Sequence, residues 1–297
     1  MNKIKELKLE GVYPALITPF TEDDEIDKEG LRKIVEYVTE EGVSGVVPCG
    51  TTGESATLSL KEHKKVIETV VECSKVPVIA GTGSNNTKEA IEFTEFAEDV
   101  GADGVLLITP YYNKPNRKGL MRHFETIAKM VDIPVILYNV PSRTGLNMTP
   151  DVVAELAEVP EIVGIKEASG DLKQVMEIIE RTEGKDFVVL SGDDILTLPI
   201  MVLGGKGVIS VAANIVPKML TTMVKEMLEG KTTRARELHY KLVPLFKALF
   251  LETNPVPVKK AAEMMGLIES GGVRLPLAEI SWDNEDRLAS ALREVLK

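Results

Sequence analysis

The chain has 297 residues, 44% of them hydrophobic and 27% charged, and carries a formal net charge of −11. This length and composition are typical of a globular protein with a full core, arranged as one large domain or two ordinary ones. The excess of acidic residues disfavours a general nucleic-acid-binding or anionic-membrane surface. No apolar run approaches the roughly 20 residues of a membrane span, and the charged N-terminal stretch MNKIKELKLE has no apolar signal region. We therefore expect a cytoplasmic protein that binds neither nucleic acid nor membrane.

Cysteine and histidine usage predicts no metal site. The two cysteines, Cys49 and Cys73, do not form a CxxC pair, so we expect reduced thiols. The three histidines, His63, His123 and His239, share no ligand spacing.

Eight short apolar runs recur along the chain, each followed by a polar turn. Their apolarity is continuous rather than alternating, which favours parallel strands covered on both faces. The runs occupy residues 12–20, 45–50, 76–83, 104–112, 133–141, 162–169, 187–194 and 206–214.

Between these runs lie longer segments with helical spacing, such as residues 28–42, 59–75 and 87–101. Each apolar run and the helical segment after it form one strand–helix unit. Eight such units, at a spacing of about 20 to 35 residues, predict an α/β fold of the (β/α)₈ TIM-barrel type. The alternative, a doubly wound open sheet, needs a glycine-rich phosphate turn after the first strand. The sequence ITPFTEDDE at residues 17–25 is not such a turn.

After residue 214 the pattern is helical throughout, with apolar periodicity in residues 217–230, 232–252, 255–267 and 284–297. No low-complexity linker precedes these segments. We expect a barrel catalytic domain over residues 1–230 and a C-terminal helical extension, residues 231–297, packed on it.

In a barrel, the reacting groups lie at the carboxyl ends of the strands. Polar residues interrupt five of the predicted strand ends, where all would converge on one mouth. They are Thr51 and Thr52, Tyr111 and Tyr112, Tyr138 and Arg143, Lys166, and the run from Ser191 to Asp194.

Lys166 stands inside the apolar stretch IVGIKEASGD. Burial of a lysine favours its neutral amine, a nucleophile that attacks a ketone or aldehyde to form a Schiff base. The protonated imine of a 2-oxo acid acidifies the adjacent carbon, so the pattern indicates aldol-type chemistry. The alternative is an ion pair with a carboxylate such as Glu167. Because adjacent strand residues point to opposite faces, Glu167 is expected to point away.

Imine chemistry needs proton transfer, and Tyr138 is placed for it because strands five and six are neighbours in a barrel. A phenol donates or accepts a proton within a hydrogen-bonded relay, which Thr51 and Tyr112 could carry to solvent. Alternatively, Tyr138 is an amphipathic packing residue at a strand end.

Six motifs in order carry a resemblance that runs from about residue 11 to beyond NPVPVKKA at residues 254–261. The chain resembles the dihydrodipicolinate synthase family of class I pyruvate aldolases. The motifs are GTTGESATL (50–58), TPYYNKP (109–115), YNVPSRTG (138–145), GIKEASGD (164–171), LSGDD (190–194) and GVISVAAN (207–214).

The resemblance implies a role for each matching residue. Lys166 would form the imine with pyruvate, and Tyr138, Thr51 and Tyr112 would form the proton relay. Thr52, with the backbone near it, would hold the pyruvate carboxylate. The residues implied for aspartate 4-semialdehyde are Arg143 for its carboxylate, and Gly192 and Ile209 as pocket lining.

The resemblance further implies condensation followed by cyclisation, on the way to lysine and diaminopimelate, without metal or organic cofactor. It implies a homotetramer built as a dimer of dimers, in which Tyr112 reaches into the neighbouring subunit's site. Lysine-inhibited members use positions matching Ser55, Ala56, His63, Asn85, Glu89 and Tyr111. Such members often have a histidine where this chain has Leu60, so the resemblance does not by itself predict lysine inhibition here.

Sister families, such as N-acetylneuraminate lyase and 2-keto-3-deoxygluconate aldolase, share the lysine and the tyrosine. Arg143 favours the synthase, because a guanidinium binds a carboxylate through two donors. The alternative for Arg143 is a role in capping a solvent-facing loop. A non-catalytic pyruvate sensor is a further alternative, but such a protein has no use for a proton relay.

Overall fold

The computed structural model describes residues 7–297 and forms two compact units. The first unit contains residues 7–10 and 77–209, and the second contains residues 11–76 and 210–297. Within the described part of the chain, every helix is too short or too polar to cross a membrane.

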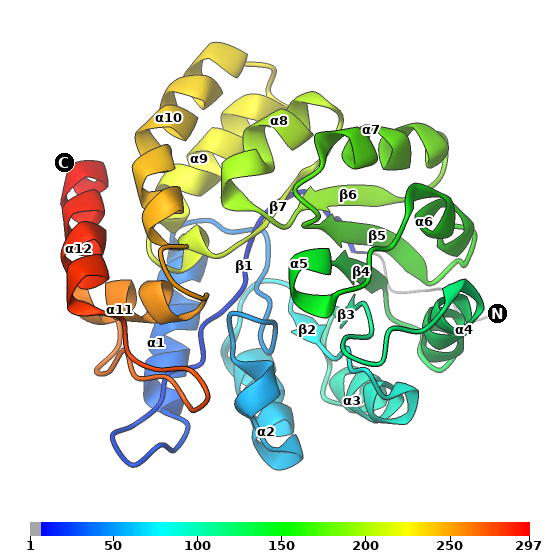
Figure 1. The fold of residues 1–297 in the computed structure, drawn as a ribbon, viewed down its shortest axis with the longest axis horizontal. Coiled ribbons are helices and arrows are strands. Elements are labelled where there is room, and N and C mark those ends of the chain that lie inside the picture. Colours follow the sequence, from blue (N-terminus) through cyan, green and yellow to red (C-terminus); the bar gives the residue numbers. More distant parts are fainter. Residues whose placement is uncertain (1–6) are drawn as a thin grey trace. The chain divides into compact units, whose positions relative to one another are not determined.

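The first unit contains a sheet in which each strand pairs in parallel with the next, in chain order (Figure 1). Nearly all of its strand residues are buried, as expected for parallel strands covered on both faces. Only the final residue of the last strand, Ser210, belongs to the second unit. The strands are β2 (Ile79–Gly81), β3 (Gly104–Ile108), β4 (Val135–Asn139), β5 (Ile162–Glu167), β6 (Val188–Ser191) and β7 (Gly207–Ser210).

Helices follow these strands, and α3, α4, α6 and α7 lie outside the strands in Figure 1. Three of them begin at an asparagine or aspartate, Asn86, Asn116 or Asp171, whose side chain accepts a backbone N–H of the first turn. The helices of the first unit are α3 (Thr87–Asp99), α4 (Arg117–Ala128), α5 (Pro141–Thr144), α6 (Pro150–Leu156), α7 (Leu172–Arg181), the 3₁₀ turn η2 (Asp194–Leu196) and α8 (Thr197–Val202).

The strands are shorter than the apolar runs that predicted them. The run 133–141 forms β4 only between Pro134 and Pro141, and the run 104–112 stops at Ile108, before Pro110. Proline has no N–H to donate to a ladder, so it limits the paired segment although the apolar run continues.

The second unit combines one complete strand with helices from both ends of the chain. In it, α10 lies beside both α9 and α12 (Figure 1), and helices occupy most of residues 217–296. Its elements are β1 (Gly11–Pro14), α1 (Lys28–Glu40), the 3₁₀ turn η1 (Ser55–Thr57), α2 (Leu60–Cys73), the 3₁₀ turn η3 (Ala212–Asn214), α9 (Pro217–Leu228), α10 (Thr232–Ala248), α11 (Val256–Met264) and α12 (Trp282–Leu296).

The predicted strand at residues 45–50 is not confirmed. Val47 forms an isolated parallel bridge with Ala15, and its N–H donates to the Pro14 carbonyl at 2.9 Å. Pro48 and the left-handed backbone of Cys49 (φ 56°) end the extended conformation there. The structure thus shows an α/β arrangement of parallel strands and helices, and the boundary at residue 230 stays a prediction.

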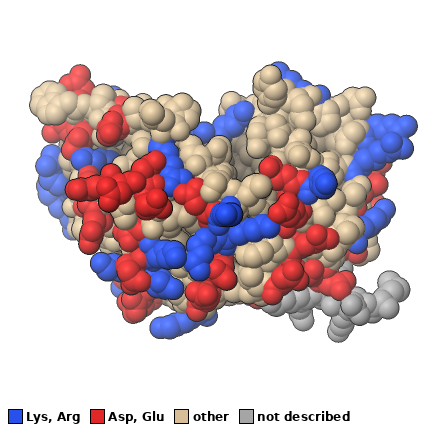
Figure 2. Space-filling view, turned by 90° about the horizontal axis from the view of Figure 1, so that it is seen from below, with Lys and Arg blue, Asp and Glu red and all other residues tan. Residues whose placement is uncertain are grey.

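Figure 2 shows acidic and basic side chains interspersed over the face that it draws. Some acidic and basic residues of the chain pair within one helix, such as Arg234 with Glu237 on α10, whose side chains are 60% and 58% exposed. Exposed pairs of this kind contribute little to stability, because water screens them.

Candidate active site

Lys166 and Tyr138 are directly opposite each other on β5 and β4. Both side chains are buried, with exposed fractions of 5% and 6%. The Lys166 Nζ atom lies 4.3 Å from the centroid of the Tyr138 ring. The prediction that these two residues lie side by side at the carboxyl ends of neighbouring strands is confirmed.

Glu167 points away from Lys166, as strand alternation predicts. Its Oε1 accepts the Ser169 N–H at 2.7 Å and its Oε2 accepts Asn139 Nδ2 at 3.1 Å. Burial raises the pKa of Glu167, although these hydrogen bonds oppose the shift. Within residues 7–297, no ion pair between Lys166 and Glu167 forms, so the structure does not support that alternative.

Gly192 leaves room for the Lys166 side chain. Its N–H donates to the Glu167 carbonyl at 2.8 Å. A Cβ atom at residue 192 would lie 2.7 Å from Ala168 Cβ, closer than real Cβ atoms approach, and 3.0 Å from Lys166 Cγ, tighter than most Cβ contacts. Ile209, on β7, is 1% exposed. The structure therefore brings Gly192 against Lys166, as predicted.

Arg143 lies on the short helix α5, which begins two residues after Asn139 ends β4. Pro141 provides the first helical position and Gly145, at φ 68°, ends the helix in the left-handed conformation. A side chain at residue 145 would also meet Lys114 Cε at 2.8 Å. Arg143 is exposed and follows Tyr138 closely in the sequence.

The tyrosine pair after β3 has two different environments. Tyr112 is 87% exposed and has a positive φ of 69°, which is uncommon for a residue other than glycine. Asn85 Nδ2 donates to the Tyr111 carbonyl at 3.2 Å, and Asn113 Nδ2 donates to the Asn85 carbonyl at 2.8 Å. The structure thus brings Asn85 to the tyrosine segment.

The residues matched to lysine inhibition divide between the two units. In the first unit Glu89 accepts a hydrogen bond from the Ser84 hydroxyl. In the second unit His63 is buried on α2, while Leu60, at the start of that helix, is 47% exposed. Ser55 and Ala56 lie in η1 of the same unit. The inhibitory role of these residues stays a prediction.

Thr51 and Thr52 lie on a tight loop of the second unit. The loop is closed by the Gly53 N–H, which donates to the Gly50 carbonyl at 3.1 Å, and by Thr18 Oγ1, which donates to the Gly53 carbonyl at 2.7 Å. Glu54 ends the turn with a left-handed backbone, φ 54°. Strained backbone of this kind is common where a loop must present functional groups. The relay from Thr51 to Tyr138 of the first unit stays a prediction.

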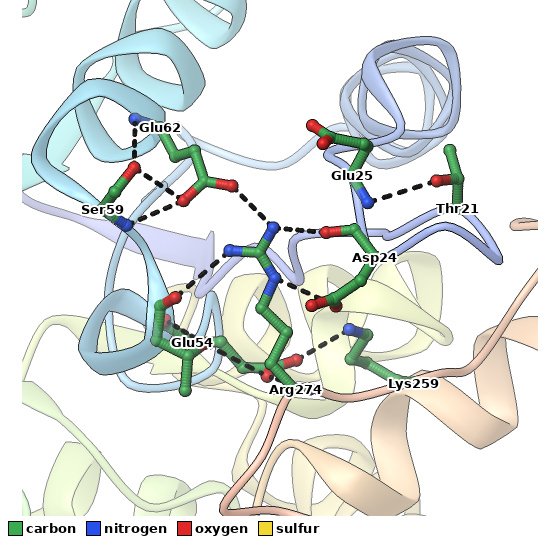
Figure 3. A network of polar contacts seen from close by, with 9 residues as sticks. Thr21, Asp24, Glu25, Glu54, Ser59, Glu62, Lys259 and Arg274 are labelled. Atoms are coloured by element: carbon green, nitrogen blue, oxygen red, sulfur yellow. Dashed lines mark hydrogen bonds and ion pairs between the residues drawn. The ribbon is translucent and has the colours of Figure 1, made fainter.

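Residues from the C-terminal segment anchor this loop, and Figure 3 shows those that contact Glu54. Asn254 Nδ2 donates to Thr52 Oγ1 at 3.0 Å. Lys259 Nζ lies 2.7 Å from Glu54 Oε1, and both side chains are essentially inaccessible to solvent. The Arg274 N–H donates to Glu54 Oε2 at 3.1 Å. Burial lowers the pKa of Lys259, and the Glu54 carboxylate opposes that shift.

The sequence analysis did not identify these anchors. Lys259 and Glu54 are 205 positions apart in the chain, so no local pattern links them. The available indication was that both belong to recognised motifs, GTTGESATL and NPVPVKKA.

The described residues form no cluster suited to a metal ion. No group of three or more histidine, cysteine, aspartate or glutamate side chains in residues 7–297 could hold a metal ion. Burial lowers the pKa of His123 to about 4, and its Nδ1 lies 2.9 Å from Thr87 Oγ1. This histidine is therefore a neutral core residue near neutral pH.

The model of the Dihydrodipicolinate synthetase family matches residues 8–295. The chain belongs to this family. It is 64% identical over 286 residues to a 4-hydroxy-tetrahydrodipicolinate synthase of Methanosarcina mazei, covering 96% of this chain and 98% of that protein. The resemblance found in the sequence motifs is thereby confirmed, and with it the type of enzyme.

Solved structures in the family share the fold. A dihydrodipicolinate synthase from Aquifex aeolicus is 49% identical, with a TM-score of 0.94 and coverage of 96% of this chain and 98% of that one. The 4-hydroxy-tetrahydrodipicolinate synthase from Methylacidiphilum fumariolicum SolV is 46% identical, with a TM-score of 0.95 and coverage of 97% and 96%. Both sequence identities are high enough to indicate a shared family as well as a shared fold.

Proposed function

We propose that this chain condenses pyruvate with L-aspartate 4-semialdehyde to give 4-hydroxy-tetrahydrodipicolinate, a step toward lysine and diaminopimelate. The observation that carries the proposal is the buried Lys166, in register with Tyr138 and without a carboxylate partner in the described residues. A relative that is 64% identical and named 4-hydroxy-tetrahydrodipicolinate synthase supports the choice of substrates.

In the first step the Lys166 amine attacks the C2 carbonyl of pyruvate. The carbonyl oxygen leaves as water, and a protonated imine joins Nζ to C2. Tyr138, whose ring lies beside Nζ, would move protons to and from the departing oxygen. Thr51 and Tyr112 would connect Tyr138 to solvent.

In the second step the imine accepts electrons from the pyruvate methyl group. Loss of a methyl proton gives an enamine, whose terminal carbon adds to the aldehyde carbon of the semialdehyde. The aldehyde oxygen becomes the hydroxyl of the product after it takes up a proton. The amino group of the semialdehyde then attacks C2 and displaces Lys166, which closes the ring and frees the enzyme.

The two carboxylates would have separate binding groups. Thr52 and the backbone N–H groups of its loop would hold the pyruvate carboxylate. Arg143 would hold the carboxylate of the semialdehyde through its guanidinium. Gly192 and Ile209 would line the pocket, and the close approach of Gly192 to Lys166 supports this assignment.

We also propose the finer features that the resemblance implies. These are a closed eight-stranded barrel with the C-terminal helices as an extension, a tetramer built as a dimer of dimers, action in the cytoplasm and catalysis without a cofactor. The three backbone hydrogen bonds that run in parallel between residues 12–16 and 44–47 support a strand pair at the position where a second barrel strand is expected.

Borohydride trapping tests the function. Pyruvate plus borohydride is expected to add one reduced pyruvate to Lys166, located by peptide mass mapping, and the unmodified protein is expected to turn over pyruvate with aspartate 4-semialdehyde. Lys166→Ala should lose both activities. Lys173→Ala, which removes an exposed lysine of α7, should retain both.

Each failure has a separate meaning. An adduct at another residue, or none, would refute the imine mechanism. Trapping at Lys166 combined with better turnover of N-acetylneuraminate or 2-keto-3-deoxygluconate would identify a sister lyase. Trapping without turnover of any aldehyde would indicate a pyruvate-binding protein.

A further inference from the structure

The next residues along β4 and β5 after Tyr138 and Lys166 form a second pair of opposite neighbours. Asn139 on β4 is opposite Glu167 on β5, and their exposed fractions are 0% and 1%. Because successive strand residues point to opposite faces, this pair projects away from the face that holds Lys166 and Tyr138. Asn139 Nδ2 donates to Glu167 Oε2 at 3.1 Å, which joins the two strand ends.

Glu167 has donors around both of its oxygens. Besides Asn139, the Ser169 N–H donates to Oε1 at 2.7 Å and Gln174 Nε2 donates to the same oxygen at 3.4 Å. An ionised carboxylate is an acceptor only, so it matches this set of donors. A neutral amide of the same shape would place a donor against a donor.

Asn139 also holds the segment that follows α5. Its Oδ1 accepts the Met148 N–H at 2.9 Å, and its Nδ2 donates to Asn147 Oδ1 at 2.9 Å. Asn147 Nδ2 in turn donates to Gln174 Oε1 at 2.7 Å. The segment from α5 to Met148 contains Arg143, so these hydrogen bonds link the strand ends to the helix that carries the arginine.

We propose that Glu167 and Asn139 are positioning residues that hold Lys166, Tyr138 and the Arg143 segment in one geometry. The inference rests on the proposed function, because that function gives Lys166 and Arg143 their roles. Neither positioning residue is assigned a contact with substrate. A displacement of about 1 Å at a reacting group can lower a rate by on the order of 100-fold, so rigid support behind the strand ends has a catalytic consequence.

Glu167→Gln tests the proposal with a minimal change in shape. The expected result is a fall of about 10- to 100-fold in kcat/KM for aspartate 4-semialdehyde, with a smaller change in the KM for pyruvate and with Lys166 still trapped by borohydride. The double variant Asn139→Asp/Glu167→Gln exchanges the two groups, so that residue 139 carries the carboxylate and residue 167 the amide. The side-chain amides of Asn147 and Gln174 can flip to keep each donor facing an acceptor. This double variant should recover about tenfold of the loss.

Thr94→Val is the matched control. It removes a buried hydrogen bond of the same unit, Thr94 Oγ1 to Thr82 Oγ1 at 2.9 Å, away from the Glu167 cluster. It should lower the melting temperature without changing either KM. Asn147→Ala, at an exposed position, replaces Glu167→Gln if that variant fails to fold, and should raise the KM for the semialdehyde several-fold while sparing pyruvate.

The outcomes separate the two proposals. If the unmodified protein is not trapped at Lys166, the proposed function fails. If it is trapped and active, and folded Glu167→Gln or Asn147→Ala keeps unchanged kinetics, the positioning role is refuted. It is equally refuted if these variants lose activity only in proportion to their unfolded fraction, or if the double variant shows no recovery.

Discussion

Two buried lysines of this chain differ in whether a carboxylate lies beside the amine. The Lys259 amine lies 2.7 Å from a Glu54 carboxylate oxygen, which offsets the cost of burying an ammonium. Both amines lie over an aromatic ring, with Lys259 Nζ 4.0 Å from the centroid of Phe20 and Lys166 Nζ 4.3 Å from that of Tyr138, but among the described residues Lys166 has no carboxylate partner. A ring face attracts a cation less strongly than a carboxylate does. Lys259 is therefore suited to hold structure, and Lys166 to react.

Arg143 is the residue that sets the choice of the second substrate in our proposal. Arg143→Ala should lower kcat/KM for aspartate 4-semialdehyde, because losing a charge-assisted pair in a pocket costs about 2 to 4 kcal/mol. Formation of the pyruvate imine should continue, since Arg143 is not assigned to pyruvate. Steady-state kinetics in both substrates, with borohydride trapping, measure the difference.

Arg181→Ala is a suitable control for this variant. It removes an exposed arginine at the end of α7 and should leave both kinetic parameters unchanged. Arg143→Lys should recover part of the loss, since it keeps the charge without the fork of donors. A similar decline for both substrates in Arg143→Ala would contradict the assignment.

At the scale of elements, the sequence predicted where strands occur better than where they end. Lys166 was placed correctly because its apolar run, 162–169, is close to the observed β5. The run at 45–50 was not confirmed as a strand, because Pro48 and the backbone of Cys49 interrupt it. Apolarity predicts burial, whereas strand ends depend on which N–H groups find partners.

Sequence patterns did not identify the residues that hold the site in place, for two different reasons. Asn139 and Glu167 each follow a predicted catalytic residue, and strand alternation could have identified them as an opposite-face pair. The contact between Arg274 and Glu62 joins positions 212 residues apart, so no periodicity or spacing could predict it. Such contacts follow from the fold rather than from local sequence.

A hydrogen bond between Arg274 and Glu62, at the start of helix α2, is expected to contribute less to stability as the pH falls. Arg274 Nη2 donates to Glu62 Oε1 at 2.6 Å. This bond is the largest of the contacts that lower the pKa of Glu62 from its ordinary 4.5 to about 2, and hydrogen bonds from Ser59 add to it, although burial opposes the shift. A carboxyl whose pKa is lower in the folded state stabilises folding above its unfolded pKa and loses that contribution as pH falls. The stabilisation should be complete above about pH 4.5 and decline toward pH 2.

Arg274→Met should therefore lower the free energy of unfolding near pH 7 by about 1 to 3 kcal/mol. The difference from the unmodified protein should shrink between pH 4.5 and the lowest pH at which both remain folded. Denaturant unfolding at several pH values measures it. Arg234→Met, which breaks an exposed pair, should cost no more than about 0.5 kcal/mol. A loss for Arg274→Met that stays constant down to pH 3 would refute the pH-dependent support.

At the scale of the whole molecule, Tyr112 raises the question of subunit assembly. It is 87% exposed, and its left-handed backbone, φ 69°, costs energy for a residue with a Cβ atom. Lys114, two residues further, also has a positive φ, of 43°. An exposed aromatic ring with a polar tip, held on strained backbone, is suited to a contact with another subunit.

We expect Tyr112 to complete the relay in the active site of a partner subunit. Lys166→Ala and Tyr112→Phe proteins, each nearly inactive alone, should regain activity when unfolded and refolded together. In a mixed dimer, one site would contain intact Lys166 and receive intact Tyr112 from its partner. Random mixing places half of the dimers in the mixed form, so recovery approaches about a quarter of the unmodified activity if sites act independently. Mixed dimers verified by differential tags but without recovery would mean that Tyr112 acts within its own chain.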